Sequence, residues 1–307
     1  MEVYIMNFNQ IISQFQAEMM HQGITPPDEI IGDSKLHRFH VKGDRSVSKN
    51  GWYVLYLDGT PSGVYGSWKK GTFWKWCSKQ WINMSLLERQ AQSDRIKEAC
   101  KARQIIKMQE QEAVAAQAAV YWAGYSPARP SHPYLVKKRI PPFCARQCDG
   151  ELVLPIMDFS GKVWSLQYIL ENGGKRFLSG GAIKSHFIPL NHRPAQDKKI
   201  LICEGFATGG TLAKHHPDYC VIAACDAGNL KSVVLTLRHH LPNAQLIIAA
   251  DDDRLTPDNP GITKGREAAI ASGSLFTKPQ WPNNSPISLT DFNDLDCWLA
   301  AHEVIHV

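Results

Sequence analysis

Short apolar runs alternate with helix-forming segments over the last third of the chain, and this alternation limits the possible fold more than any other feature. Strands are predicted at 199–205, 219–225, 244–253 and 274–279, and helices at 206–216, 229–241 and 263–273. Short all-apolar strands that alternate with helices form a parallel sheet covered on both faces. The sequence therefore predicts an α/β domain whose ligand site lies beyond the carboxyl ends of its strands.

Acidic residues follow two of these predicted strands. Glu204 ends the first strand, and Asp251 and Asp253 end the third. Side chains two positions apart in an extended segment point to the same side, so Asp251 and Asp253 can share a metal ion while Asp252 points away or caps the next turn. Mg²⁺ prefers such hard oxygen ligands. A single acid at a strand end is usually a helix cap or a loop residue, but the combination favours a site for one or two divalent ions.

The segments around these acids resemble a known family. ICEGFATG (202–209) and IIAADDD (247–253) are similar to the two motifs of the Toprim domain, which occurs in bacterial primases, topoisomerases, OLD-type nucleases and the RecR recombination protein. In that family a Glu ends one strand and a DxD motif ends a later one. The resemblance implies Mg²⁺ or Mn²⁺ on Asp251 and Asp253, and a catalytic or metal-bridging role for Glu204.

A later acidic motif, TDFNDL (290–295), resembles one that often follows in Toprim primases. The resemblance makes Asp291 and Asp294 candidate ligands of a second metal ion. The alternative is that these two residues cap the helix expected for DLDCWLAAH, and the sequence leaves both interpretations open.

The resemblance extends beyond the Toprim motifs. YWAGYSPARPSHPYLVKKRI (121–140), LVLPIMDFSGKVWSLQYILENGGKRFLSGG (152–181) and NPGITKGREAA (259–269) are similar to segments of phage- and plasmid-type DNA primases, the alpha/TraC-like and DnaG-related group. It covers about residues 120–296. It implies a mixed α+β primase-like region before the Toprim domain.

A Gly-rich basic loop is predicted at 171–186 within that region. Lys175, Arg176 and Lys184 match, by order and spacing, the basic ridge that DnaG-like primases use for the template and the incoming nucleotides. Their physical role would be to neutralise phosphate, which Arg can grip with two hydrogen bonds. The alternative is a mobile surface loop with incidental basic residues.

Aromatic and lysine residues alternate in the segment 51–76, where Asn-Gly and Asp-Gly turns predict a small antiparallel sheet of three to five strands over 37–76. Bases stack on aromatic rings while lysines meet the backbone of a single strand, so this segment is a candidate single-stranded DNA surface. The alternative is that the rings form the core of the sheet. The candidate residues are Trp52, Trp68, Lys69, Lys70 and Trp74.

Charge divides the chain into a basic front and an acidic back. Residues 34–139 carry 19 Lys and Arg against 7 Asp and Glu, a net charge of +12, whereas residues 199–307 carry 8 against 12, a net charge of −4. A polyanion held by one part and a metal ion held by the other would explain this distribution, although a solvated basic helix would explain the first half equally well.

Four segments are predicted from these patterns: a small β-rich aromatic and basic module at 1–82, a long helical connector at 83–125, the primase-like α+β region at 126–197 and the Toprim domain at 198–307. The fold class is α/β. Primases of this group usually begin with a four-ligand zinc ribbon, but Cys144 and Cys148 form the one closely spaced cysteine pair, so no zinc is expected. The eight scattered cysteines and the lack of a long apolar run favour a reducing cytoplasm and no membrane partner.

The function predicted first is that of a DNA primase of a mobile element, a nucleotidyltransferase that makes short oligonucleotides on single-stranded DNA with Mg²⁺ or Mn²⁺. Its partners would be single-stranded DNA and nucleoside triphosphates. A separate helicase or replication protein is also expected, because the sequence has no G-x-x-x-x-G-K-[ST] phosphate loop. The alternatives are a non-catalytic Toprim nucleic-acid-binding protein and a Toprim nuclease. A topoisomerase would need a nucleophilic Tyr on a further domain.

Overall fold

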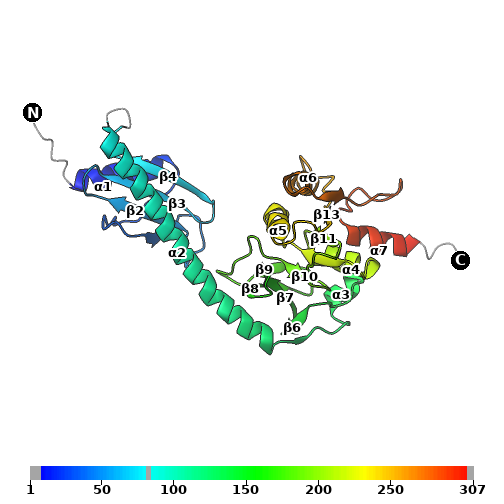
Figure 1. Ribbon diagram of the computed structural model, residues 1–307. Coiled ribbons are helices and arrows are strands. Elements are labelled where there is room, and N and C mark those ends of the chain that lie inside the picture. The colour runs from blue at the N-terminus through cyan, green and yellow to red at the C-terminus, as the bar shows by residue number, and fades with distance from the viewer. Residues whose placement is uncertain (1–7, 81–83, 303–307) are drawn as a thin grey trace, which may run out of the picture. The chain divides into compact units, whose positions relative to one another are not determined.

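The computed structural model describes residues 8–80 and 84–302. They fall into two compact units, one up to Gln109 and the other from Glu110 onward (Figure 1). The long helix α2, Leu86–Gly124, runs through the boundary between the units. None of the helices in the described ranges is long and apolar enough to cross a membrane.

The first unit is a four-stranded antiparallel sheet with a helix against each face. The helix α1 covers one face with Phe15 and Met19, and α2 covers the other with Ala99. Alternate residues of the second strand supply the two faces, Tyr53 to the first and Trp52 to the second, because successive side chains of a strand point to opposite sides. The elements are α1 Phe8–His21, β1 His37–Phe39, β2 Gly51–Tyr56, β3 Ser62–Ser67 and β4 Thr72–Cys77, paired in chain order.

A second antiparallel sheet opens the other unit. It pairs β5 to β9 in chain order, and the later part of α2 packs on it through Ala118, which contacts the cluster of Val153 and Leu166. The prediction of a loop over residues 171–186 was wrong for residues 175–177, which hydrogen-bond to the neighbouring strand as a short edge strand. The elements are β5 Ser126–Pro127, α3 Pro133–Lys138, β6 Arg146–Cys148, β7 Glu151–Met157, β8 Val163–Ile169 and β9 Lys175–Phe177.

The third sheet is the parallel one that the sequence predicts. Its strand order is β10-β12-β11-β13-β14, with β10 antiparallel and the other strands parallel, so that β11 lies in the middle. The bounds are β10 Ile188–Pro189, β11 Ile200–Cys203, α4 Phe206–His215, β12 Cys220–Ala223, α5 Ala227–His240, β13 Leu246–Ala249, α6 Pro260–Ser272, β14 Leu275–Thr277 and α7 Phe292–His302.

Helices cover both faces of this sheet, which confirms the α/β prediction. On one face Leu201 packs with Phe206 and Leu212 of α4, and on the other Ile202 packs with α5 and α6, which lie side by side (Figure 1). The strands are shorter than predicted. In particular β13 ends at Ala249, so the three consecutive aspartates follow the strand and are not part of it.

Burial on both faces of β11 gives a stability prediction. Replacing Ile202, which is fully buried, or Leu201, which is 4% exposed on the opposite face, with Ala should each lower the free energy of unfolding by about 2–5 kcal/mol, because either change leaves a cavity. Urea unfolding measures the loss. The control is Ile270→Ala on the 83% exposed surface of α6, where the change should stay within about 0.5 kcal/mol. Equal losses in all three variants would contradict the two-sided burial.

Candidate functional site

Two carboxylates meet at the carboxyl edge of the parallel sheet. The strands β11 and β13 are neighbours in register, with Cys203 opposite Ala249, so Glu204 and Asp251 both leave the sheet at the same edge. They line one pocket together with Asp291, which precedes α7, and Lys175, which belongs to β9. The remaining lining residues are Tyr134, Lys137, Lys138, Asn172, Gly173, Gly205, Ala207, Thr208 and Cys225.

The acids of this pocket are buried among like charges. Burial, and then the charges of Glu204, Asp291 and Asp253, raise the pKa of Asp251 to about 8, while Lys175 opposes this shift. Burial also raises the pKa of Glu204, with further contributions from Asp253 and Asp226. The pKa of Asp291 is raised by burial and by the neighbouring Asp294. Two or more carboxylates brought together out of water hold protons tightly unless a cation compensates their charge.

The Oδ1 atom of Asp251 is the feature that most suggests a ligand. It is buried and accepts no hydrogen bond from any residue in the described ranges. Buried polar atoms in folded proteins nearly always have a partner, and an orphaned one commonly marks a site for an ion or a ligand. Oxygen donors of negative charge are those that Mg²⁺ and Mn²⁺ prefer. The pocket therefore fits a divalent cation in its chemistry. However, nowhere in the described residues do three or more Asp, Glu, His or Cys side chains stand together as a ready-made ligand set.

Asp253 lies apart from the pocket lining. Its Oδ2 atom accepts a hydrogen bond of 2.9 Å from the backbone N–H of Gly261, near the start of α6, and its own N–H donates to Asn259. The absence of a side chain at Gly261 matters here, because a Cβ at this position would lie 2.4 Å from the carbonyl oxygen of Asp251. The side chain of Asp253 thus binds a helix N-terminus, which favours negative charge. Asp251 and Asp253 would point to the same side in an extended strand, but β13 ends at Ala249, before both residues.

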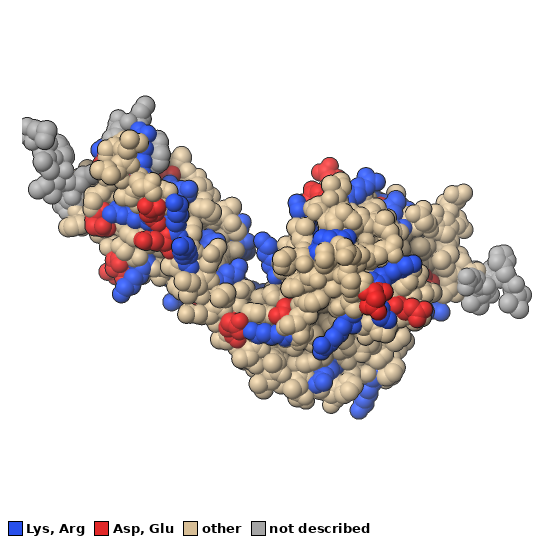
Figure 2. All heavy atoms as spheres, viewed as in Figure 1, with Lys and Arg blue, Asp and Glu red and all other residues tan. Residues whose placement is uncertain are grey.

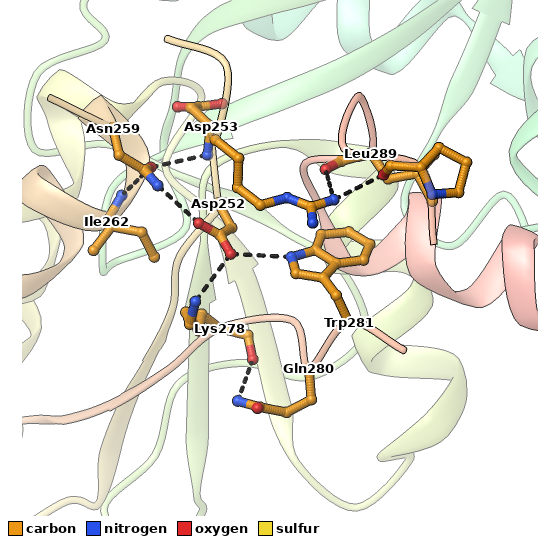
Figure 3. Close-up of polar contacts among 10 residues, drawn as sticks. Asp252, Asp253, Asn259, Ile262, Lys278, Gln280, Trp281 and Leu289 are labelled. Atoms are coloured by element: carbon orange, nitrogen blue, oxygen red, sulfur yellow. Dashed lines mark hydrogen bonds and ion pairs between the residues drawn. The ribbon is translucent and has the colours of Figure 1, made fainter. Parts of the chain in front are cut away.

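Asp252 is not among the pocket-lining residues, and its carboxylate holds the turn in place through the contacts shown in Figure 3. Its carboxylate accepts hydrogen bonds from Asn259 Nδ2 at 2.7 Å and from Trp281 Nε1 at 3.0 Å, and pairs with Lys278 Nζ at 3.0 Å. Burial acts to raise the pKa of Asp252, but these hydrogen bonds together outweigh it and lower the pKa. The Asp252 side chain is therefore a buried anchor, and sequence reasoning missed its partners because they come from distant positions.

Asp291 and Asp294 form a reciprocal cap at the start of α7. Asp291 Oδ1 accepts from the N–H of Asp294 at 2.7 Å, and Asp294 Oδ2 accepts from the N–H of Thr290 at 3.1 Å. Asp294 also lies 3.4 Å from Lys138 Nζ. Only Asp291 of this pair lines the pocket. The capping interpretation therefore describes both residues, and a ligand role remains open for Asp291.

The three predicted basic residues are in different surroundings. Lys175 lines the pocket, and its Nζ lies against Gly205 at the start of α4. Arg176, the next residue of the edge strand, pairs with Glu151 at 2.6 Å and stacks over Tyr168. Lys184 is exposed and is not among the pocket residues. Lys137 and Lys138 were not predicted as site residues, although they lie in the segment 121–140 that resembles primases, and the end of α3 brings them to the pocket.

The predicted DNA-binding aromatic residues lie mainly within the first unit's core. Trp52 is 1% exposed, so a base cannot reach its ring, and its assignment to an accessible surface was wrong. Trp74 is half-buried and stacks on Tyr65. Trp68 is half-buried beside Trp52. Of the two lysines, Lys69 pairs with Asp44 at 2.7 Å and Lys70 is exposed.

Comparison with known proteins finds a family that matches the part of the chain containing the parallel strands. The Toprim domain family matches residues 199–298. Two proteins named DNA primase TraC, both from Escherichia coli, are 33% identical over 261 residues and 32% identical over 266 residues, which is 82% and 83% of this chain. These matches cover 18% and 25% of the relatives, so the chain spans about a fifth to a quarter of their length.

Solved structures with a similar arrangement include the primase fragment of the bacteriophage T7 primase-helicase protein, with a TM-score of 0.43 and 18% identity over 59% of this chain and 78% of that one. A second is the DnaG primase catalytic domain bound to ssDNA, with a TM-score of 0.43 and 14% identity over 64% of this chain and 80% of that one. Residues 199–298 of the chain match the Toprim domain. Over most of its length the chain resembles the TraC DNA primases.

The hydrogen bonds of Asp252 predict that its side chain stabilises the turn beside the pocket. Asp252→Ala should lower the free energy of unfolding by about 1–3 kcal/mol, because Asn259 and Trp281 lose a buried acceptor. The matched control is Asp258→Asn, which removes a negative charge from an exposed position of the same turn and should leave stability nearly unchanged. Urea unfolding of both variants measures the difference, and equal stabilities would show that the anchor contributes nothing.

Proposed function

We propose that the protein is a DNA primase-like nucleotidyltransferase of a mobile element, which joins nucleotides on a single-stranded DNA template. The observation that supports this most is the pocket of Glu204, Asp251, Asp291 and Lys175, in which Asp251 Oδ1 is buried without a hydrogen-bond partner among the described residues. Acids gathered at the carboxyl edge of a Toprim sheet beside a lysine suit a substrate that carries both phosphates and a metal ion. The similarity to the TraC primases supports the same choice of reaction.

Asp251 is the residue we assign first to a divalent cation, with Glu204 and Asp291 as its neighbours in the pocket. Asp253 and Asp294 remain further candidates, although each now binds a backbone N–H. A bound Mg²⁺ or Mn²⁺ would polarise the phosphate and offset the charge that develops during phosphoryl transfer. The raised pKa of Asp251, due first to burial and then to its acidic neighbours, is the shift that a cation would reverse.

Other roles, in binding the substrate and accepting a proton, are assigned to Lys175, Glu204 and the remaining basic residues. Lys175 would neutralise the triphosphate, because it is the basic side chain that opposes the raised pKa of both Asp251 and Glu204. Glu204 would accept the proton of the attacking 3′-hydroxyl as that oxygen bonds to the α-phosphorus and pyrophosphate leaves. Its pKa, raised by burial, suits a general base better than that of an exposed glutamate. Arg176 and Lys184 remain candidates for the template backbone.

The proposal extends to organisation and partners. We retain the segments 1–82, 83–125, 126–197 and 198–307 as proposed functional divisions, with single-stranded DNA and nucleoside triphosphates as substrates. A separate helicase or replication protein would supply the open template. The chain spans only a fifth to a quarter of its TraC relatives, so activity of the whole protein belongs to the proposal as well.

A second candidate function is a non-catalytic Toprim module that binds nucleic acid. The observation in its favour is that the described acids are not assembled as a metal ligand set. A Toprim nuclease would use the same acids on DNA phosphates. The three functions differ in what they do to a DNA strand, so one assay separates them.

A priming assay tests the reaction. Purified full-length chain, single-stranded DNA, labelled nucleotides and Mg²⁺ or Mn²⁺ should give short template-dependent products. Glu204→Gln and Asp251→Asn should each lower the rate by at least about 100-fold, because they remove charge from the reacting centre. The control Asp258→Asn changes one exposed acid of the neighbouring turn and should keep the wild-type rate.

Three outcomes have distinct meanings in that assay. Products that disappear in the two pocket variants and persist in the control establish the primase. Cleaved DNA with no products would replace the primase by the nuclease. Intact DNA without products would favour the binding module, because the pocket would then hold nucleic acid without acting on it.

Metal binding has its own prediction. Mn²⁺ should raise the melting temperature of the wild type, since a ligand that binds the folded state alone stabilises it by about 2.7 kcal/mol at 100 times its dissociation constant. Asp251→Asn should lose this rise, whereas Asp258→Asn should keep it. A thermal melt with and without Mn²⁺ measures the effect, and an equal rise in all three proteins would place the metal elsewhere.

A further inference from the structure

The first unit has a cluster of cations and aromatic rings that the proposed reaction does not use. Arg103 of α2 lies over three rings of the sheet, with its Cζ atom 4.9 Å from the ring centre of Trp52, 5.0 Å from that of Trp68 and 5.9 Å from that of Phe73. One turn later, Lys107 Nζ lies 5.8 Å from the ring centre of Trp68. Positions four apart share one face of a helix, so both cations meet the same patch of the sheet.

These two cations are held by rings and not by acids. Across residues 8–80 and 84–302, no carboxylate forms an ion pair with either Arg103 or Lys107. A cation over an aromatic face is attracted by about 0.5–1 kcal/mol at an exposed site, which orients it without neutralising it. Their positive charge therefore remains available to an anion from outside the unit.

The two indole rings beneath these cations also have unsatisfied polar atoms. The Nε1 atoms of Trp52 and Trp68 are both buried and have no hydrogen-bond partner in the described chain. An indole N–H normally finds a partner when it is buried. Here both indole N–H groups lack a polar partner among the described residues, and the Arg103 guanidinium lies over both rings. A packed core does not need cations over its indole rings. A surface that binds an anion benefits from cations that are held at fixed positions in this way.

Phe73 adds an accessible ring to the same surface. It lies on β4, in register with Gly66 of β3, which in turn pairs with Trp52. Its side chain is 43% exposed, although it faces the same side of the sheet as the buried Trp52. The lack of a side chain at Gly66 allows the backbone of β4 to lie close to β3, because a Cβ at Gly66 would lie 2.4 Å from the carbonyl oxygen of Thr72.

We propose that Arg103, Lys107 and Phe73 form a binding surface for single-stranded DNA, distinct from the metal pocket. The two cations contact successive phosphates, and a base stacks on Phe73. This pairing of cations with an exposed ring is how proteins hold single strands without reading their sequence. The surface deepens the proposed function by giving the template a second contact, and it differs from the aromatic residues that the sequence suggested.

Charge favours a polyanion as the occupant. Residues 34–139 carry a net charge of +12, yet the face shown in Figure 2 mixes Lys and Arg with Asp and Glu. The excess charge alone therefore does not define a binding surface. The local arrangement does, because Arg103 and Lys107 add two unneutralised charges beside an exposed ring.

DNA binding by the full-length chain tests the proposal. The measurement is the fluorescence anisotropy of a labelled oligo-dT, made without nucleotides or metal ions and over a range of salt concentrations. The double variant R103Q/K107Q should bind at least about 10-fold more weakly, and the slope of log affinity against log salt should fall by about 1.4, as expected when two single-strand phosphate contacts are lost. Phe73→Ala should weaken binding by about 5-fold or more, the loss of one stacked base.

The matched control is K97Q/K101Q, which removes the same charge from the same helix one to two turns earlier. Its affinity should fall by less than about 2-fold. An equal loss in both double variants would overturn the proposal, because general charge would then explain binding. Duplex DNA bound as tightly as the single strand, or displacement of the DNA by polyglutamate of equal charge, would also overturn it. Lys107→Gln alone, which changes only an exposed side chain, preserves the test if Arg103 proves necessary for folding.

The metal-pocket variant separates this surface from the proposed reaction. Asp251→Asn should bind oligo-dT like the wild type even if it makes no products. Binding that fails in R103Q/K107Q while the metal-dependent rise in melting temperature persists would support the surface by itself. Priming that fails in every protein, with the binding pattern intact, would overturn the proposed function and leave this surface in place.

Discussion

The burial of acidic groups at the edge of the central parallel strands is the constraint on which the site depends. β11 lies between β12 and β13 and is covered on both faces, so whatever follows its last residue is partly withdrawn from water. Glu204 and Asp251 are therefore brought close to each other in a region of low dielectric, where like charges repel strongly. Such an arrangement destabilises the empty pocket and favours a cation or a proton.

The three consecutive aspartates at 251–253 have different contacts and different roles in the folded protein. Asp251 lines the pocket, Asp252 pairs with Lys278, and Asp253 accepts a hydrogen bond from the N–H of Gly261. The Asp252 side chain is 3% exposed and both of its oxygens accept hydrogen bonds, whereas Lys278 is 40% exposed, so the pair holds the turn without burying a second charge.

The first unit follows a similar logic with aromatic groups. Alternation along β2 sends Tyr53 to the face of α1 and Trp52 to the face of α2, so one strand supplies two cores. On the α2 side the apolar contact of Ala99 gives way within one turn to Arg103. The rings there carry cations in place of further apolar neighbours, which leaves a charged and partly aromatic surface at the end of a packed core.

The sequence by itself determined the parallel sheet, the Toprim resemblance and the position of Glu204 and Asp251 at the carboxyl edge of that sheet, because short apolar strands and the acids after them are local patterns. Only the tertiary structure decided which groups share the pocket. It added Lys138 from α3, moved the Asp253 side chain to a helix start, and placed Trp52 in the core. Those outcomes depend on where strands end and on contacts between distant segments, and periodicity carries no information about either.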